Sequence, residues 1–166
     1  MERNENVKIT DKMSFGLDKR IKDELSMKTN LKIELWDADG HLKEVREVHN
    51  TTTSAALAGL MDQILASPTL AKPGWIELGT GSPAATLLGA YIVGSRVAVT
   101  TKTRVTNVVT LVGDWGAGVG TGSITEAGIF DVVTANTVNM WCSASFGVVT
   151  KGVNDVLKLT WTLTQN

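Results

Sequence analysis

The segment Asp155–Gln165 alternates between large apolar side chains and a second set made mostly of Lys and Thr. The apolar set is Leu157, Leu159, Trp161 and Leu163. A period of two residues, with β-branched and aromatic side chains and neither Gly nor Pro, is typical of a β-strand. One face of this strand has to be buried while the other meets water, which is the pattern of an antiparallel sheet with one solvated side.

Similar short apolar segments, separated by turn residues, fill the chain after Pro73. The segments that we expect to be strands are Gly74–Leu78, Arg96–Arg104, Val105–Val112, Ser123–Asp131, Asn136–Thr150 and Asp155–Thr164. With a charged hairpin over Leu31–His49, expected to be an outer, solvated pair, the chain has about eight strands. The pattern predicts an all-β fold, an antiparallel β-sandwich of jelly-roll type, with a closed barrel as the alternative.

One segment, Ala55–Ala66, has the composition of a helix. Asn50–Ser54 offers N-cap residues before it, and Ser67-Pro68 ends it because the residue before a proline is displaced from the helical region. The apolar stripe of this helix is Leu57, Leu60, Met61, Ile64 and Leu65. We expect the helix to cover one end or one open face of the sheets.

Charge and apolar content exclude several classes of protein. A formal charge of −1 argues against a nucleic-acid-binding protein, which normally has a basic stripe. No apolar stretch is long enough to span a bilayer, and the N-terminus is too charged for a secretory signal. The single cysteine, Cys142, cannot form an intramolecular disulfide. We therefore expect neither a nucleic-acid nor a membrane partner.

Residues 1–30 are dense in charged and amide side chains and differ from the rest of the chain. We divide the sequence into an arm, Met1–Asn30, and a β-domain, residues 31–166. Within the arm, a short amphipathic helix is expected from about Leu17 to Met27. The arm is either a solvated terminus or a segment that orders on a neighbouring subunit. In the second case its apolar anchors are Met13, Phe15, Leu17, Ile21 and Leu25.

Three features invite a ligand-binding interpretation, and each has a simpler explanation. The loop Gly113–Gly122 lacks the Lys and the following helix of a phosphate-binding loop, so a mobile loop or a glycine-lined subunit contact is favoured. Asp37–Gly40 resembles the start of a calcium loop, but Val48 stands where the bidentate Glu belongs, so a hairpin turn is favoured. His41 and His49 share a face without a third metal ligand and are interpreted as solvated. We expect no metal and no cofactor.

Glu126 is the acidic residue that stands out. Within Ile124–Phe130 it shares the face of Ile124, Gly128 and Phe130, and a buried carboxylate has to be hydrogen-bonded or paired. We expect a structural acid that ties down the glycine-rich loop Gly113–Gly122. Cys142 is interpreted as a small buried core residue.

The tryptophans all fall in or beside expected strands. They are Trp36, Trp75, Trp115, Trp141 and Trp161. In a chain with 3 Phe and 1 Tyr, core filling and interface anchoring are the expected uses. No catalytic residue is assigned, because no nucleophile motif is present and neither His has a recognisable catalytic context.

Three segments carry a resemblance to a known family. They are WIELGTGS at Trp75–Ser82, GSITEAGIFD at Gly122–Asp131 and KGVNDVLKLTWTLT at Lys151–Thr164. In this order they resemble small virion structural proteins of tailed bacteriophages, over roughly Leu31 to the C-terminus. The resemblance implies a jelly-roll-like capsid decoration (cement) protein on the outside of the head.

Such a protein is not an enzyme. It is made in the host cytoplasm, clamps neighbouring major capsid subunits and forms a homo-oligomer, a trimer or a dimer that matches the local symmetry of the shell. The arm and the body would supply two contacts whose linkage raises their combined affinity.

Two other functions stay open. A tail-fibre or receptor-binding module would display exposed aromatic side chains and bind glycan or a host surface. A glycan-active enzyme would need paired carboxylates, for which Glu126 with Asp131 or Asp114 is the candidate set.

Overall fold

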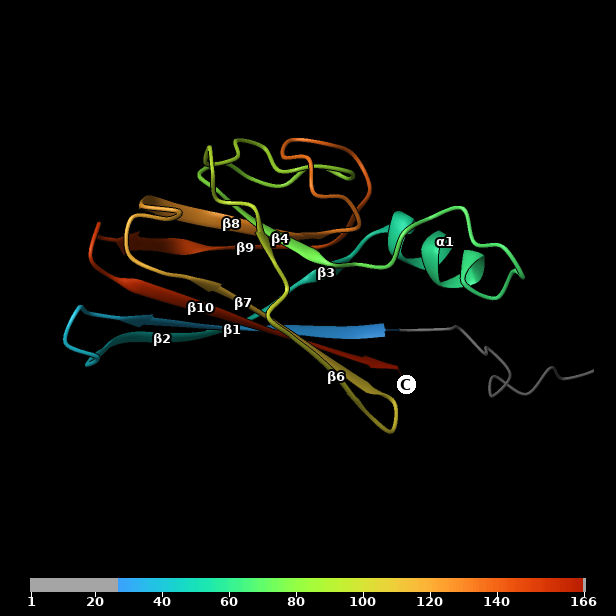
Figure 1. The fold of residues 1–166 in the computed structure, drawn as a ribbon, viewed down its shortest axis with the longest axis horizontal. Coiled ribbons are helices and arrows are strands. Elements are labelled where there is room, and N and C mark those ends of the chain that lie inside the picture. The colour runs from blue at the N-terminus through green and yellow to red at the C-terminus, as the bar shows by residue number, and fades with distance from the viewer. Residues whose placement is uncertain (1–26, 166) are drawn as a thin grey trace, which may run out of the picture.

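The computed structural model describes residues 27–165, and its elements form two layers with a helix at one end (Figure 1). The sheet that contains both ends of the described chain is built from β1 (Met27–Trp36), β2 (Leu42–His49), β6 (Thr101–Val105), β7 (Val108–Trp115) and β10 (Val156–Gln165). The other sheet is built from β3 (Thr51–Thr52), β4 (Trp75–Gly79), β5 (Val97–Ala98), β8 (Gly122–Phe130) and β9 (Met140–Lys151). The helix, α1, spans Ser54–Asp62.

Strand order in the first sheet is β2-β1-β10-β7-β6, and in the second β3-β9-β8-β4-β5. Every pair of neighbouring strands within residues 27–165 is antiparallel. The predicted all-β antiparallel sandwich is thus confirmed. The predicted C-terminal strand is central: β10 lies between β1 and β7, and Leu31 of β1 stands opposite Trp161.

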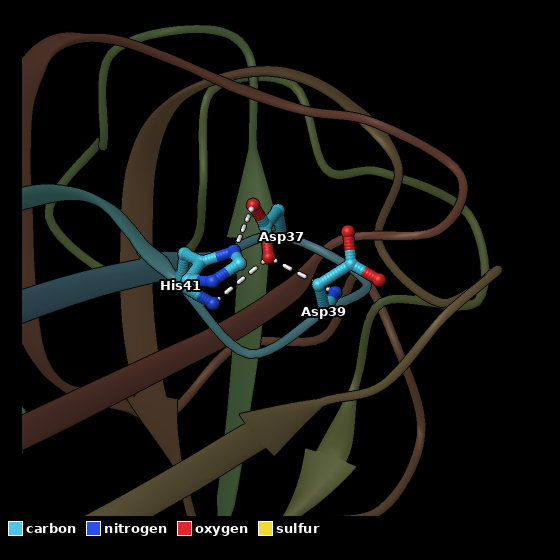
Figure 2. A group of neighbouring side chains, drawn as sticks. All are labelled: Asp37, Asp39 and His41. Carbon is cyan, nitrogen blue, oxygen red and sulfur yellow. Dashed lines mark hydrogen bonds and ion pairs between the residues drawn. The ribbon is translucent and has the colours of Figure 1, made fainter.

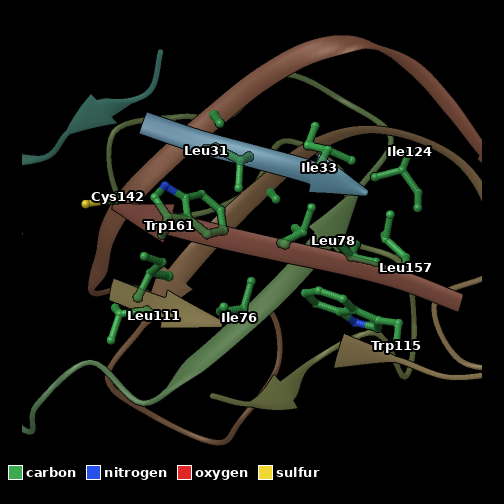
Figure 3. Packing of buried hydrophobic residues seen from close by; sticks show 14 of the residues in the cluster. Leu31, Ile33, Ile76, Leu78, Leu111, Trp115, Ile124, Cys142, Leu157 and Trp161 are labelled. Carbon is green, nitrogen blue, oxygen red and sulfur yellow. The ribbon is translucent and has the colours of Figure 1, made fainter. Parts of the chain in front are cut away.

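The core fills the space between the two sheets (Figure 3). From the first sheet, Leu31, Leu111 and Trp161 point inward, and all three are buried. Ile76 of β4 and Ile124 of β8 face them from the second sheet. Alternation along β10 predicted which of its side chains are inward, and this prediction is confirmed.

A second apolar cluster lies on the outer face of the second sheet. It contains Leu88, Phe130 and Met140, with Trp75 and Tyr91 packed against it. The loops that follow β4 and β8 cover this face in Figure 1. Both faces of the second sheet are therefore buried here, which explains why consecutive residues of β8, from Glu126 to Phe130, are all buried.

Several predicted boundaries are wrong. β1 begins at Met27, where it pairs with Gln165, so part of the predicted arm belongs to the sheet and Met27 is not helical. The β1–β2 hairpin is the outer pair of the first sheet, as predicted: β2 is the exposed edge strand, and β1 joins it to β10. β7 continues to Trp115, and Trp115 is fully buried. The predicted flexible connection Gly113–Gly122 is thus partly strand, and a Cβ at Gly113 would lie 2.9 Å from Ile76 Cδ1.

The helix is shorter than predicted and packs through another face. Thr53 is its N-cap and accepts a hydrogen bond from Ala56 N–H. It ends at Asp62, whose carboxylate accepts the N–H of Leu70 at 2.8 Å and so turns the chain back. Ala56 and Gly59 are its buried residues. The predicted apolar stripe is instead solvent-exposed, because only small side chains fit against β9.

Candidate interaction surface at the α1 end

The open end of the sandwich beside α1 is hollowed by a groove of about 480 Å³. Figure 1 shows α1, the start of β1, the β6–β7 hairpin and the end of β10 at this end of the molecule. The lining residues are Met27, Leu57, Leu60, Gln63, Lys72, Pro73, Lys102, Arg104, Thr106, Asn107, Val109, Leu111, Trp141, Leu163 and Gln165. Five strands and the helix therefore contribute to one depression.

The groove combines apolar walls with basic side chains. Its apolar lining comes largely from both layers of the core, including Trp141, Leu111 and Leu163. Its charged lining residues are Lys72, Lys102 and Arg104, and none of the described residues that line it is acidic. Burial, and then the neighbouring Lys72, lowers the pKa of Lys102. The site suits a ligand with apolar side chains flanked by carboxylates.

Exposed apolar side chains continue from the groove over α1 and the turn after it. Met61 is 58% exposed, Ile64 75% and Leu65 56%. Leu57 and Leu60 are also exposed, and they belong to the groove. We call these five side chains together the α1 patch. Contiguous exposed apolar side chains of this kind mark surfaces that bind other proteins or membranes.

The predicted partner-contact residues lie outside the described part of the chain. They are Met13, Phe15, Leu17, Ile21 and Leu25. The described chain begins at Met27, and Met27 itself lines the groove. The α1 patch was visible in the sequence as an apolar stripe, but its exposure was not, because the stripe was assigned to the core.

Glu126 is a structural acid, as predicted, but it holds a different loop. Its Oε1 accepts the N–H groups of Gly81 at 2.9 Å and Ala90 at 2.8 Å, and its Oε2 accepts that of Gly89 at 3.0 Å. The side chain is fully buried. The predicted link to the loop 113–122 is therefore wrong: the carboxylate fastens the two ends of the segment that covers the second sheet.

The position of Glu126 also depends on a β-bulge. The register of β8 against β9 shifts between Ile124 and Glu126. Ile124 consequently faces the core, whereas Glu126 lies with Gly128 and Phe130 on the outer face, so the predicted common face is wrong for Ile124. A bulge inserts an extra residue in one strand, which reverses the alternation beyond it.

Sequence reasoning missed a second buried polar group on the same face. Arg96 Nη2 donates to Glu77 Oε2 at 2.8 Å, and both side chains are at most 3% exposed. The guanidinium also lies over the Phe130 ring, 3.9 Å from its centroid, and its Nη1 donates to the Val132 carbonyl at 2.7 Å. This arrangement fixes the loop after β8. Its only sequence signal is a Glu inside an otherwise apolar strand.

The β1–β2 turn brings Asp37, Asp39 and His41 together (Figure 2). One ligand atom from each lies within 4.8 Å of the others. The Asp37 carboxylate, however, already accepts the N–H groups of Asp39 at 2.9 Å and His41 at 2.8 Å. These bonds, above all that from His41, lower the pKa of Asp37. These three residues therefore make the internal hydrogen bonds of a hairpin turn. Gly40 in this turn has φ +82°.

The carboxylates of Asp114 and Glu126 do not converge on each other. Asp114 and Glu126 lie on the outer faces of opposite sheets, so the sandwich separates them and they cannot act on one bond. Burial raises the pKa of Asp131. His49 is exposed, and its Nδ1 lies 2.8 Å from Asn30 Oδ1. Cys142 is buried in the core, as predicted, and burial raises its pKa to about 12.

The tryptophans divide between the core and the surface. Trp115, Trp141 and Trp161 are buried, as core filling predicts, whereas Trp36 and Trp75 are half-buried.

Within residues 27–165, no helix has the length and apolarity needed to cross a membrane. No family model, curated protein or solved structure matches the chain.

Proposed function

We propose that the chain is a non-enzymatic virion structural protein that binds the outside of a phage capsid and stabilises the contacts between major capsid subunits. The α1 patch carries this proposal. It is an exposed apolar surface at the end of the molecule where the arm joins the body, and it adjoins a basic groove. The family resemblance supplies the capsid as the partner.

The stiffness of the body supports a clamping role. Buried polar groups fasten the loops over the outer face of the second sheet: Glu126 holds the segment 81–90, and the Arg96–Glu77 pair holds the loop after β8. A rigid body loses little conformational entropy when it binds. Linking such a body to a separate arm lets two weak contacts act together. The predicted contact residues of the arm are Met13, Phe15, Leu17, Ile21 and Leu25.

The jelly-roll type of the sandwich and its assembly into a homo-oligomer are part of the same proposal. Two sheets of antiparallel strands agree with a jelly-roll type of sandwich at the level of the layers. The hairpins β6–β7 and β8–β9 each stay within one sheet. A homo-oligomer, dimer or trimer, would place several copies of the α1 patch around a symmetry axis of the shell.

Capsid binding tests the proposal. Ile64→Ser removes the most exposed apolar side chain of the α1 patch, and Val153→Ser is the matched control, because Val153 is also apolar, 61% exposed and lies in the β9–β10 turn. Undecorated heads are mixed with each protein, and co-sedimentation and resistance of the heads to heat are measured. We expect Ile64→Ser to bind at least several-fold more weakly than Val153→Ser.

Two results would contradict it. If the wild-type protein neither binds the heads nor protects them, the capsid role is wrong. If Ile64→Ser and Val153→Ser bind equally well, the α1 patch is not the contact surface, and the arm alone has to account for binding.

One observation favours a receptor-binding module as the second candidate. Trp36 borders a hollow of about 360 Å³ that is also lined by Asp37, Asp114 and Lys158. An aromatic ring beside carboxylates is a common platform for a sugar. Glycan-array binding that is lost in Trp36→Ala, together with no binding to heads, would support this function instead.

A further inference from the structure

We propose that the groove at the α1 end is the docking site for the arm of the same molecule, which seats Leu25, Ile21 and Leu17 against its apolar lining. The ligand is thus an amphipathic segment of this chain. This inference goes beyond the proposed function and does not depend on a capsid. It concerns how the arm is held on the body before any partner binds.

The first argument is the point at which the chain enters the body. Met27 is the first residue of β1 and lines the groove. One residue, Ser26, separates it from Leu25. A segment tethered directly to its site has a very high effective concentration there, of the order of millimolar or above for short linkers. Any other apolar ligand has to compete with it.

The second argument is the direction of the side chains along β1. Thr29, Leu31, Ile33 and Leu35 are buried, and Met27 packs against the same core. Side chains two residues apart lie on the same face of a strand. The described chain therefore begins with a Met27 side chain that faces the core and lines the groove.

The third argument is the pattern of the arm itself. Leu17, Ile21 and Leu25 are four residues apart and form one apolar stripe on a helix. An isolated helix of this length is marginal in water and needs an apolar surface to become stable. A groove lined by Leu57, Leu60 and Trp141 is such a surface, and seating an amphipathic helix in an apolar groove is a recurrent binding mode.

Charge supplies the fourth argument. At about 100° per residue, Asp18 and Glu24 fall within about 60° of the centre of the apolar stripe, one on either side. The charged side chains that line the groove are Lys72, Lys102 and Arg104. The carboxylates that border the stripe therefore complement the groove, because its charged lining side chains are all basic among the described residues.

Docking in this way divides the arm into two parts. The part from Leu17 to Leu25 is the proposed ligand of the groove, and the part that contains Met13 and Phe15 is not assigned to it. The docked part also covers Leu57 and Leu60 of the α1 patch. Met61, Ile64 and Leu65 stay free for a partner.

Disulfide trapping in the full-length chain tests the proposal. Ile21→Cys is combined with Leu60→Cys in a Cys142→Ala background, and the matched control combines Ile21→Cys with Val153→Cys, which lies in the β9–β10 turn. After mild oxidation, we expect most of the first pair, and little of the control pair, to form a cross-link within one molecule. Mass spectrometry of a mixture of isotope-labelled and unlabelled protein identifies links between molecules.

Charge reversal provides the second measurement. Glu24→Lys is expected to slow formation of the Ile21–Leu60 cross-link several-fold, and adding Arg104→Glu is expected to restore much of the rate. Equal trapping of both cysteine pairs would overturn the proposal, because it would show an arm without a fixed site. Trapping only between molecules would also overturn it, since the groove would then hold the arm of a second copy.

Discussion

Glu126→Gln is the change that most directly tests how the second sheet is held together. The substitution keeps the size of the side chain and replaces one carboxylate oxygen with an NH2 group. Glu126 is fully buried, and its two oxygens accept three backbone N–H groups. A glutamine can keep Gly81 and Ala90 as donors to its Oε1, but its Nε2 then faces the N–H of Gly89.

The cost follows from this geometry. One charge-assisted hydrogen bond, worth about 1.5–3 kcal/mol, is lost, and two donors are left facing each other without an acceptor. Removing a buried charge recovers part of the loss, because a neutral amide is easier to bury. We expect the free energy of unfolding to fall by about 2–3 kcal/mol. For a chain of this size, that corresponds to a decrease in Tm of about 4–12 °C.

Urea unfolding followed by circular dichroism measures the change, and hydrogen exchange locates it. Faster exchange is expected at the amides of Gly81, Gly89 and Ala90. Glu47→Gln is the matched control, since Glu47 is an exposed acid on the edge strand β2. If Glu126→Gln is as stable as Glu47→Gln, the carboxylate does not hold these loops and the reasoning is wrong.

Three further changes test other parts of the fold. A Cβ at Gly59 would overlap the Trp141 indole. Gly59→Ala should therefore lower the free energy of unfolding, as measured in urea, by about 1–3 kcal/mol. In a helix with open space at this position, the same change would stabilise the helix. The Lys43 ammonium, followed by a backbone N–H, lowers the pKa of Asp155. The stability that the ionised Asp155 carboxylate contributes is therefore present above its unfolded-state pKa and is lost as the pH falls below about 4. Asp155→Asn should accordingly be less stable than wild type at pH 7, and the difference should shrink in acid. The buried Cys142 thiol, with its pKa of about 12, should react with Ellman's reagent only when the protein unfolds; rapid labelling of the native protein would contradict its place in the core.

Local patterns in the sequence determined the elements whose faces differ strongly in polarity. Alternation over Asp155–Gln165 correctly predicted both the strand β10 and its buried face, because a period of two with apolar side chains on one side has only one stable arrangement in a sheet. The Asp37–Gly40 turn and the N-cap of α1 were also visible, since their geometry depends on neighbouring residues alone.

The tertiary structure decided what each face packs against. The stripe on α1 is as apolar as a core stripe, but Trp141 leaves room only for Gly59 and Ala56, so the larger side chains stay exposed. The bulge that moves Glu126 to the outer face of β8 exists only in the pairing with β9. The start of β1 at Met27 likewise depends on its pairing with Gln165, at the far end of the described chain. Propensity and periodicity are local, whereas these three features are set by contacts between residues far apart in the sequence. The groove that we assign to the arm is likewise lined by residues from distant parts of the chain.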